Sequence, residues 1–286
     1  MRLSSDYYQA RGEGWSLWLH REKWQKNLWH VVLRLIEKQP CSKHPQTLKL
    51  KASPEVGDEA LFLKVFHGGS GVAAIKDIFR DSKAFRSMHQ ATALARHNFN
   101  VPVPVAGGEK REYGLLRKAF VLTSGVEGQS LPIFLRHQSA GVPDISLFEK
   151  RNALKHLALE VRRLHEVGFI HGDLVPTNIF VYRSPSKENC FFFMDNDRTR
   201  HYPKWIPHTL WRRNLVQLNR IPLPGVTLQD RVRFLGHYLG LKEWGNKERQ
   251  LLAWLERKTR KRRTDCDSID PSVSFRQLMR WQGELK

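Results

Sequence analysis

The stretch from His171 to Asp197 constrains the architecture of this 286-residue chain more than any other. A polar loop, HGDLVPTN, is followed by the apolar runs IFVY and CFFFM, which the turn-like sequence RSPSKEN separates. Two short apolar runs joined by a polar connection are typical of a β-hairpin, whose two ends lie close together. A hairpin here would bring Asp173 and Asn178, just before its first strand, near Asp195, just after its second.

A long helix is expected immediately before this loop. Ser146 can cap the helix while Glu149, three residues later, completes a capping box, and Gly168 is a fitting terminator. A second helix is expected from Thr227, which has Asp230 three residues further on. The buried stripe predicted for the first helix comprises Leu147, Leu154, Leu157, Val161 and Leu164.

The segments before residue 125 have the character of strands with one helix among them. TLKLKAS and EALFLKVF are apolar or alternating runs separated by PEVGD, as expected for two strands joined by a turn. Residues 82–99 carry apolar side chains near helical spacing, and AFVLTSGVEG resembles a strand that runs into a Gly-rich connection. Strands first and mainly helices afterwards predict an α+β chain of two lobes, a small antiparallel-sheet N-lobe and a mainly helical C-lobe.

The start of the chain mixes tryptophan with basic residues. Residues 15–38 would form either a basic amphipathic helix lying on an anionic membrane or, the interpretation we favour, an ordinary helix or strand pair packed on the next domain. We therefore expect a basic, Trp-rich extension at 1–40, an N-lobe at 41–125, and a C-lobe at 126–286 that holds the polar loop and a basic C-terminal helix. The residues concerned are Trp15, Trp18, Trp24, Trp29, Arg21, Lys23, Lys26 and Arg34.

The polar loop has the spacing of a catalytic site. His-x-Asp-x-x-x-x-Asn, followed by an Asp after an apolar strand, is the protein-kinase-like signature. In phosphoryl transfer Asp173 can hydrogen-bond the acceptor hydroxyl and take its proton, which makes it the candidate catalytic residue. Mg2+ prefers hard oxygen ligands, which Asn178 and Asp195 supply while phosphates and water complete the octahedron. His171 is expected to brace the loop.

A kinase-like site also needs a cation against the α- and β-phosphates, carried on an early strand. Lys64 in LFLKVF stands at that place and is the candidate phosphate-binding residue. The alternative is an edge-strand lysine that improves solubility. Lys76 is a weaker competitor because it follows GGSGVAA and not a strand pattern.

Two usual features of kinase-like sites are missing from the early segments. The helix expected at 82–99 contains no glutamate to hold the strand lysine. Either Asp77, Asp81 or Asp195 orients Lys64, or this helix does not align with the kinase pattern, or catalysis is weakened. A glycine-rich phosphate loop is not evident in QTLKLKASPEVGDEALF, where only Gly57 is a candidate. Both gaps concern the nucleotide site and leave the catalytic loop unaffected.

Taken together, LFLKVF, NVPVPVAGGE, AFVLTSGVEGQSL, HGDLVPTNIFV and MDNDRTR resemble the lipopolysaccharide kinase family, which includes heptose and Kdo kinases of the inner core. RRNLVQLNRIPLPGVTLQDRVRFLGHYLG is similar to its C-terminal part. The resemblance implies a bilobal kinase-like fold, ATP as donor, and a sugar hydroxyl on a lipid-anchored core oligosaccharide as acceptor. It assigns Asp173, Asn178, Asp195 and Lys64 the roles given above, and it places DNDR in the family's DxDR pattern without a role.

Charge and cysteine content bear on partners and location. The formal net charge is +20, from 48 Lys and Arg against 28 Asp and Glu, which predicts attraction to polyanions. RKTRKRR at 257–263 adds to this field, and near an anionic membrane each cation contributes about 1 kcal/mol. Cys41, Cys190 and Cys266 are too widely spaced for a disulfide framework. The few cysteines favour a reducing cytoplasm, and the lack of an apolar signal or span favours a soluble or peripheral protein. The resemblance implies that it is peripheral on the cytoplasmic face of the inner membrane.

Three functions remain open. The favoured one is an ATP-dependent kinase of heptose or Kdo in the lipopolysaccharide inner core. The second is a kinase of a soluble molecule such as an aminoglycoside or a choline-like alcohol, although a cationic acceptor fits a basic chain poorly. The third is a catalytically impaired kinase-like protein that binds polyanions. Among the possible polyanionic partners, nucleic acid is less favoured than lipopolysaccharide or an anionic membrane surface. The sequence points to no particular oligomeric state.

Overall fold

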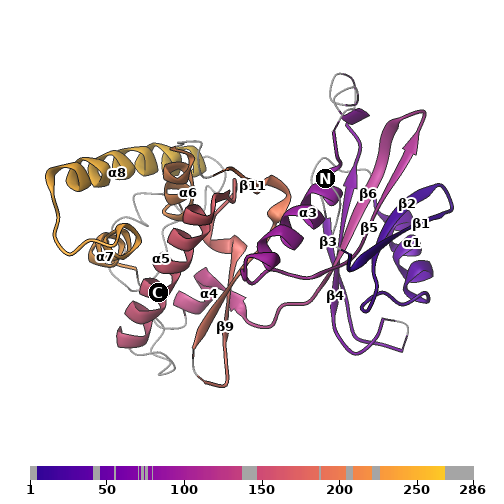
Figure 1. Cartoon of the computed structure of the whole chain (residues 1–286), viewed down its shortest axis with the longest axis horizontal. Helices are drawn as coiled ribbons and strands as arrows, with labels where there is room; N and C mark the ends of the chain where they lie inside the picture. The colour runs from indigo at the N-terminus through magenta and orange to yellow at the C-terminus, as the bar shows by residue number, and fades with distance from the viewer. Residues whose placement is uncertain are drawn as a thin grey trace. The chain divides into compact units, whose positions relative to one another are not determined.

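The computed structural model of the chain contains two compact units, residues 1–126 with 195–198 and residues 127–194 with 199–286 (Figure 1). Each unit is described separately below. The structure describes residues 5–40, 46–54, 56–69, 71, 74, 77–78, 80–136, 147–186, 188–203, 209–220 and 226–267.

The first unit is built on a six-stranded sheet with the order β1-β2-β5-β6-β4-β3, in which every neighbouring pair is antiparallel. The two strands predicted in TLKLKAS and EALFLKVF are β3 and β4, which pair directly. The predicted antiparallel sheet is thus confirmed. The strands are β1 Tyr7–Gly12, β2 Trp15–His20, β3 Gln46–Leu50, β4 Leu61–His67, β5 Pro104–Glu112 and β6 Leu115–Ser124.

The N-terminal residues belong to this sheet, which corrects the expected separate extension at 1–40. β1 and β2 form a hairpin, and β2 pairs with β5. WSLWLH buries every second side chain, with Trp15 only 3% exposed, so residues 15–20 follow the period of a strand. Helix α1 is confined to Leu28–Lys38, and its apolar stripe of Leu28, Val32 and Ile36 packs into the same core.

Helix α3, Lys83–Arg96, fulfils the prediction for residues 82–99. Ser82 caps it, because its hydroxyl accepts a hydrogen bond from the Phe85 amide at 3.1 Å. Met88 is fully buried and packs over β5 at Gly107. A Cβ at Gly107 would collide with the Met88 sulfur, so the absence of a side chain there allows α3 to approach the sheet.

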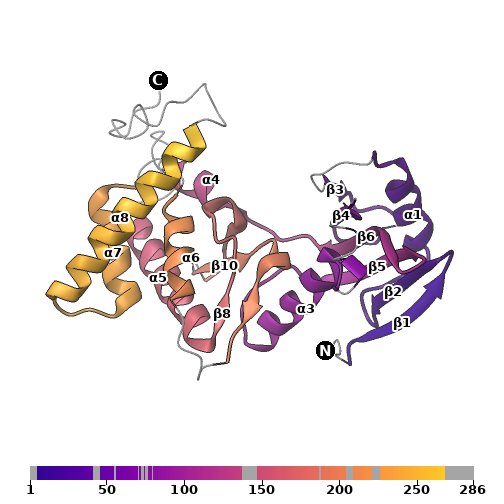
Figure 2. The same ribbon diagram turned by 90° about the horizontal axis from the view of Figure 1, so that it is seen from above.

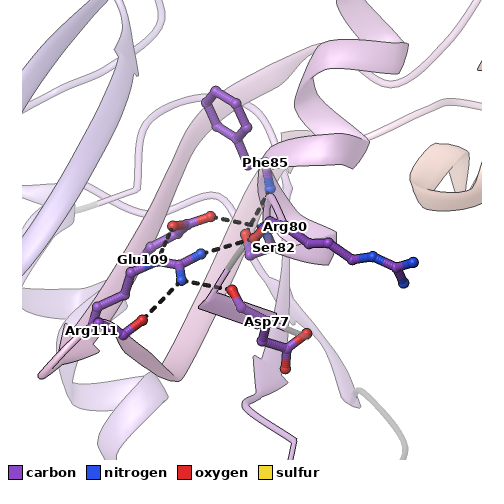
Figure 3. A network of polar contacts seen from close by, with 7 residues as sticks. Asp77, Arg80, Ser82, Phe85, Glu109 and Arg111 are labelled. Atoms are coloured by element: carbon purple, nitrogen blue, oxygen red, sulfur yellow. Dashed lines mark hydrogen bonds and ion pairs between the residues drawn. The ribbon is translucent and has the colours of Figure 1, made fainter. Parts of the chain in front are cut away.

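A polar network fixes the start of α3 to β5 (Figure 3). Buried Glu109 accepts a hydrogen bond from the Ser82 amide at 3.0 Å and pairs with Arg111 at 2.9 Å. Arg111 also donates to the carbonyl oxygens of Asp77 at 2.9 Å and Arg80 at 3.2 Å. Together, these bonds hold Ser82 and the chain before it to one strand, which sets the position of the start of α3 within the first unit.

The second unit is mainly helical, as predicted, with one small three-stranded sheet of order β10-β9-β7 and a two-stranded pair of β8 and β11. Figures 1 and 2 both show α6 beside α8. The helices are α4 Leu131–Arg136, α5 Leu147–Val167, α6 Leu210–Leu218, α7 Leu228–Leu239 and α8 Asn246–Asp267. The strands are β7 Gln129–Ser130, β8 Phe169–Ile170, β9 Ile179–Arg183, β10 Asn189–Phe193 and β11 Arg200–His201.

Helix α5 matches most of its predicted apolar stripe. Leu154, Leu157, Val161 and Leu164 are buried, whereas Leu147 in the first turn is 56% exposed, so its predicted burial is wrong. Ser146, the predicted cap, lies outside the described residues. The helix ends before Gly168, which has φ +101° and serves as the predicted terminator.

Helix α7 begins as predicted, with Thr227 and Asp230 in a reciprocal capping box. Asp230 also forms a buried ion pair with Lys150 of α5 at 2.9 Å. Burial by itself would raise the pKa of Asp230, but hydrogen bonds from Lys150 and Thr227 outweigh it and lower the pKa. The pair therefore links α5 to α7 in its charged form.

None of the helices in the described part of the chain combines the length and apolar character that a bilayer-spanning helix requires.

Candidate active site

The polar loop HGDLVPTN lies between β8 and β9 in the second unit and closes on itself. Two backbone amides of the loop are used locally: Val175 N–H donates to the Asp173 carbonyl, and Asn178 N–H, at the end of the 3-10 turn Pro176–Asn178, donates to the Val175 carbonyl, both at 2.9 Å. The Asn178 side-chain amide nitrogen also donates to the Asp173 carbonyl, at 3.0 Å. The backbone that carries Asp173 is thus held from two directions.

The predicted hairpin is present and positions Asn178. Strands β9 and β10 pair antiparallel with Ile179 opposite Phe193. The Met194 amide donates to the Asn178 carbonyl at 2.9 Å, which extends the ladder by one step. Asn178 therefore lies beside Met194, the residue that directly precedes Asp195 in the chain.

His171 is fully buried and ties the loop to the end of the hairpin, in agreement with the expected bracing role. Its Nε2 atom lies 2.9 Å from the Met194 carbonyl oxygen. The Thr199 hydroxyl donates to the His171 carbonyl at 3.2 Å. Since Nε2 faces a carbonyl oxygen, it must carry the proton in this contact.

Asn214 and Gln217 of α6 clamp the loop, and sequence reasoning did not identify them. Asn214 Oδ1 accepts from the His171 amide at 3.1 Å. Gln217 donates through Nε2 to the Gly172 carbonyl at 2.8 Å and accepts from the Leu174 amide at 3.3 Å. The two side chains also bond each other at 2.9 Å. Their spacing of three residues, which places both on one face of α6, was the available signal.

A second layer of contacts orients Asn214. Its Oδ1 atom lies 3.0 Å from His165 Nε2, and His165 Nδ1 lies 2.8 Å from the Tyr238 hydroxyl. Because Asn214 Oδ1 only accepts, Nε2 of His165 carries a proton, and in the neutral ring Nδ1 accepts from Tyr238. Burial raises the pKa of Tyr238, so the phenol stays protonated and able to donate.

In the first unit, Lys64 lies on β4, between β3 and β6, so the alternative of an edge-strand lysine is wrong. Its Nζ atom lies 2.5 Å from Oδ1 of Asp195. Of the three acids that were candidates to orient Lys64, Asp195 makes the contact, while the Asp77 carboxylate accepts from the Gly69 amide at 3.1 Å. Asp195 thus stands where kinase-like sites usually use a helix glutamate.

The backbone around Asp195 is unusual. Asp195 has φ +56°, a left-handed conformation that non-glycine residues adopt rarely and that concentrates at functional sites. Burial raises the pKa of nearby Asp197, and the negative charge of Asp195 raises it further, against the opposing effects of Lys64 and Arg198. The DND segment is therefore a local concentration of carboxylates held in a strained turn.

Asn178 in the second unit and Asp195 in the first unit each carry a side-chain oxygen of the kind that Mg2+ prefers. Because Asn178 uses its amide nitrogen on the Asp173 carbonyl, its amide oxygen is the atom left for a cation. Within the described ranges, no group of three or more His, Cys, Asp or Glu side chains gathers as a metal site. Mg2+ in kinase-like sites needs only one or two protein ligands, because phosphate oxygens and water molecules complete its octahedral coordination.

The connection between β3 and β4 does not offer the expected amide of Gly57. Both Val56 N–H and Gly57 N–H donate to the Ser53 carbonyl, at 2.9 and 2.7 Å, so these donors are used within the turn. Gly57 has φ +97°, which explains the glycine by the turn itself. Lys76, the weaker candidate for the phosphate-binding cation, lies outside the described residues.

An antiparallel-sheet unit with a lysine on an inner strand, and a helical unit with an HxDxxxxN loop before a hairpin, define a protein-kinase-like protein. Residues 54–238 match the model of the lipopolysaccharide kinase (Kdo/WaaP) family, and the chain belongs to this family. The resemblance seen in the sequence is confirmed. Membership of a kinase family implies ATP as the phosphoryl donor.

Two individual proteins are similar to this chain. The solved structure described as "WaaP in complex with acyl carrier protein" is 20% identical, has a TM-score of 0.59, and aligns over 86% of this chain and 98% of that chain, which shows a shared fold. The putative cyclin-dependent kinase F-2 of Oryza sativa subsp. japonica is 27% identical over 157 residues. That match covers 54% of this chain and 46% of the relative, so the chain spans about half the length of the curated relative.

Proposed function

We propose that the protein transfers the γ-phosphoryl group of ATP to a sugar hydroxyl, of heptose or Kdo, in the lipopolysaccharide inner core. The observation that carries the proposal is the catalytic loop, in which Asn178 holds the Asp173 carbonyl at 3.0 Å and the hairpin places Met194 beside Asn178. Family membership supports the kinase activity and the lipopolysaccharide acceptor.

Asp173 is proposed as the general base. Its carboxylate accepts a hydrogen bond from the acceptor hydroxyl and takes the proton as the oxygen attacks the γ-phosphorus. The contacts from Asn178, Asn214 and Gln217 fix the loop backbone around Asp173. The base therefore needs little reorganisation when the acceptor binds, which is the source of rate gain by positioning.

Lys64 is proposed to bind the α- and β-phosphates of ATP, and Asn178 and Asp195 to hold Mg2+. When bound, the ion neutralises charge on the transferring phosphoryl group. The contact with Lys64 at 2.5 Å defines where the Asp195 carboxylate lies in the first unit. Neither residue is proposed to exchange protons during the reaction.

The acceptor places the reaction at the cytoplasmic face of the inner membrane, because the core oligosaccharide is lipid-anchored. We propose that the protein is peripheral on that surface, consistent with its net charge of +20. An acyl carrier protein is a candidate partner, since the similar WaaP structure contains one. Co-purification from cells that express this chain would test that partner directly.

The test is phosphorylation of purified lipopolysaccharide whose inner core lacks phosphate, with γ-labelled ATP and mass spectrometry of the product. The parent protein should add one phosphate to a core sugar. Asp173→Ala should lower turnover by about a hundredfold to ten-thousandfold with nucleotide affinity nearly unchanged. Equal rates for the two proteins would remove Asp173 from the mechanism, and transfer to an aminoglycoside or to choline but not to lipopolysaccharide would refute the acceptor.

A further inference from the structure

Helix α6 contacts α8 in the second unit (Figure 2). Tryptophan and cationic side chains of these two helices form a cluster. The Arg212 guanidinium carbon lies 5.3 Å from the ring centroid of Trp211 and 5.8 Å from that of Trp254. The Lys258 ammonium lies 5.9 Å from the Trp254 ring. We call this cluster, with two further cations of α8, the tryptophan–cation face: Trp211, Arg212, Trp254, Arg257, Lys258 and Lys261.

Helix geometry places the α8 members of this face on one side. Positions 254, 257, 258 and 261 are separated by three and four residues, so their side chains are neighbours along the helix. Leu255 and Thr259 are buried and mark the side that packs on the unit. Arg257, Lys258 and Lys261 are exposed, and Trp254 is half-buried between them and the core.

The positive charge of this face has no ion-pair partner among the residues that the structure describes. Glu256 pairs with Arg260 at 2.8 Å, away from the face. Across the described residues, no carboxylate comes within ion-pair distance of Arg212, Lys258 or Lys261. The Nε atom of Arg212 is also buried without a hydrogen-bond partner. A flat surface that carries many negative charges would supply counter-charge to these cations.

We propose that the tryptophan–cation face binds the surface of an anionic phospholipid membrane. Half-buried tryptophan rings beside cations suit an interface that is apolar on one side and wet on the other. Leu210, next to Trp211, is 36% exposed and adds apolar surface at the same place. Of the four tryptophans of the N-terminal segment that the sequence first suggested for this role, Trp15 is buried in the sheet core, and Trp18, Trp24 and Trp29 are partly buried and pack against core residues of the first unit.

The tryptophan–cation face would be the surface by which the proposed kinase contacts the membrane, and in that respect the inference rests on the proposed function. The binding itself requires neither ATP nor a sugar acceptor. It can therefore be measured without phosphoryl transfer, and a failure of one proposal is distinguishable from a failure of the other.

The experiment is flotation of the full chain with vesicles of phosphatidylcholine alone and with added phosphatidylglycerol. Arg257→Glu/Lys261→Glu is compared with a matched control, Arg34→Glu/Lys38→Glu, in which an exposed Arg and Lys with the same spacing are reversed on α1. We expect the α8 variant to lose at least about tenfold in partitioning to anionic vesicles, and the control less than about threefold. The parent should bind neutral vesicles far more weakly.

Equal loss in both variants, or unchanged binding of the α8 variant, would overturn the proposal. Equal binding of the parent to neutral and anionic vesicles would do the same, because the argument depends on charge. Duplex DNA that displaces the parent from anionic vesicles at equal charge concentration would assign the face to nucleic acid. The control is the thermal unfolding temperature of each variant. If it equals that of the parent protein, a loss of vesicle binding reflects the changed surface and not a loss of the fold.

Discussion

The Nζ atom of Lys64 lies 2.5 Å from Oδ1 of Asp195, although 131 positions separate the two residues in the chain. The contact joins the cation proposed to bind phosphates to a carboxylate proposed to hold Mg2+. It also explains the absence of a glutamate from helix α3, because the acid that contacts Lys64 is Asp195, in the segment after β10. One carboxylate is thus proposed to serve both partners.

Asp195→Asn removes the charge from this carboxylate while keeping its shape. We expect the affinity for nucleotide in the presence of Mg2+ to fall by at least about tenfold, because a metal ligand is lost. The measurement is a titration of a fluorescent ATP analogue with and without Mg2+. Asp81→Asn, at an exposed position before α3, is the control and should bind as the parent does. An unchanged magnesium dependence in Asp195→Asn would contradict the metal role.

Gln217→Leu removes the clamp on the catalytic loop without touching Asp173. We expect kcat to fall by about tenfold to a hundredfold and KM for ATP to stay within about twofold, because the base is displaced and nucleotide binding is not. Gln217→Glu keeps the acceptor for the Leu174 amide but loses the donor to Gly172, so it should be intermediate. Gln250→Leu, on the exposed side of α8, controls for the substitution itself. Parallel changes in kcat and KM would point to a general loss of structure.

Asp230→Asn tests the buried pair with Lys150. At neutral pH we expect a loss of about 3–5 kcal/mol in the free energy of unfolding, because Lys150 is left buried without a counter-charge. The pKa of Asp230 is lowered in the folded protein from its ordinary value of 3.8, so the stability from the charged form is present above pH 3.8 and is lost as the pH falls toward the folded pKa.

Urea unfolding of the parent and Asp230→Asn at a series of pH values measures this effect. The two curves should converge below pH 3.8. The double variant Lys150→Met/Asp230→Leu, which replaces the pair by apolar side chains, should recover much of the lost stability. A constant difference between parent and Asp230→Asn at every pH would show that the carboxylate charge is not the cause.

Trp15→Ala tests whether the N-terminal hairpin is part of the core. Trp15 packs edge-on against Trp29 and Phe120, with centroid distances of 6.2 and 5.5 Å. We expect a loss of about 3–5 kcal/mol in the free energy of unfolding, measured by urea denaturation. Tyr113→Ala, at a fully exposed position, should stay within about 0.5 kcal/mol. Similar values for both variants would mean that the N-terminal strands are dispensable.

The sequence predicted what depends on local patterns. The hairpin around the turn RSPSKEN, the strand that carries Lys64, the helix at 82–99 and the cap formed by Thr227 with Asp230 were all present. In each case, neighbouring residues specify the element through periodicity or a capping pair. The order of strands followed by helices was then enough to predict the two-part α+β architecture.

Features that depend on distant partners were missed. Asn214 and Gln217 contact the catalytic loop across 43 and 45 positions, and nothing in their local sequence indicates that partner. The N-terminal segment combines a strand period at 15–20 with a helical period at 28–38, and read as one element the two periods obscure each other. Leu147 fits the helical stripe but lies in the first turn of α5, where none of the elements in the described part of the chain covers it.

The pairing of β2 with β5 has a consequence for how the protein is made. Trp15 pairs with Lys110, so a chain leaving the ribosome keeps this hydrogen-bonding edge of β2 unpaired until β5 has been synthesised. A nascent or truncated chain that stops before β5 would expose a naked strand edge, and such a fragment should depend on chaperones to stay unaggregated.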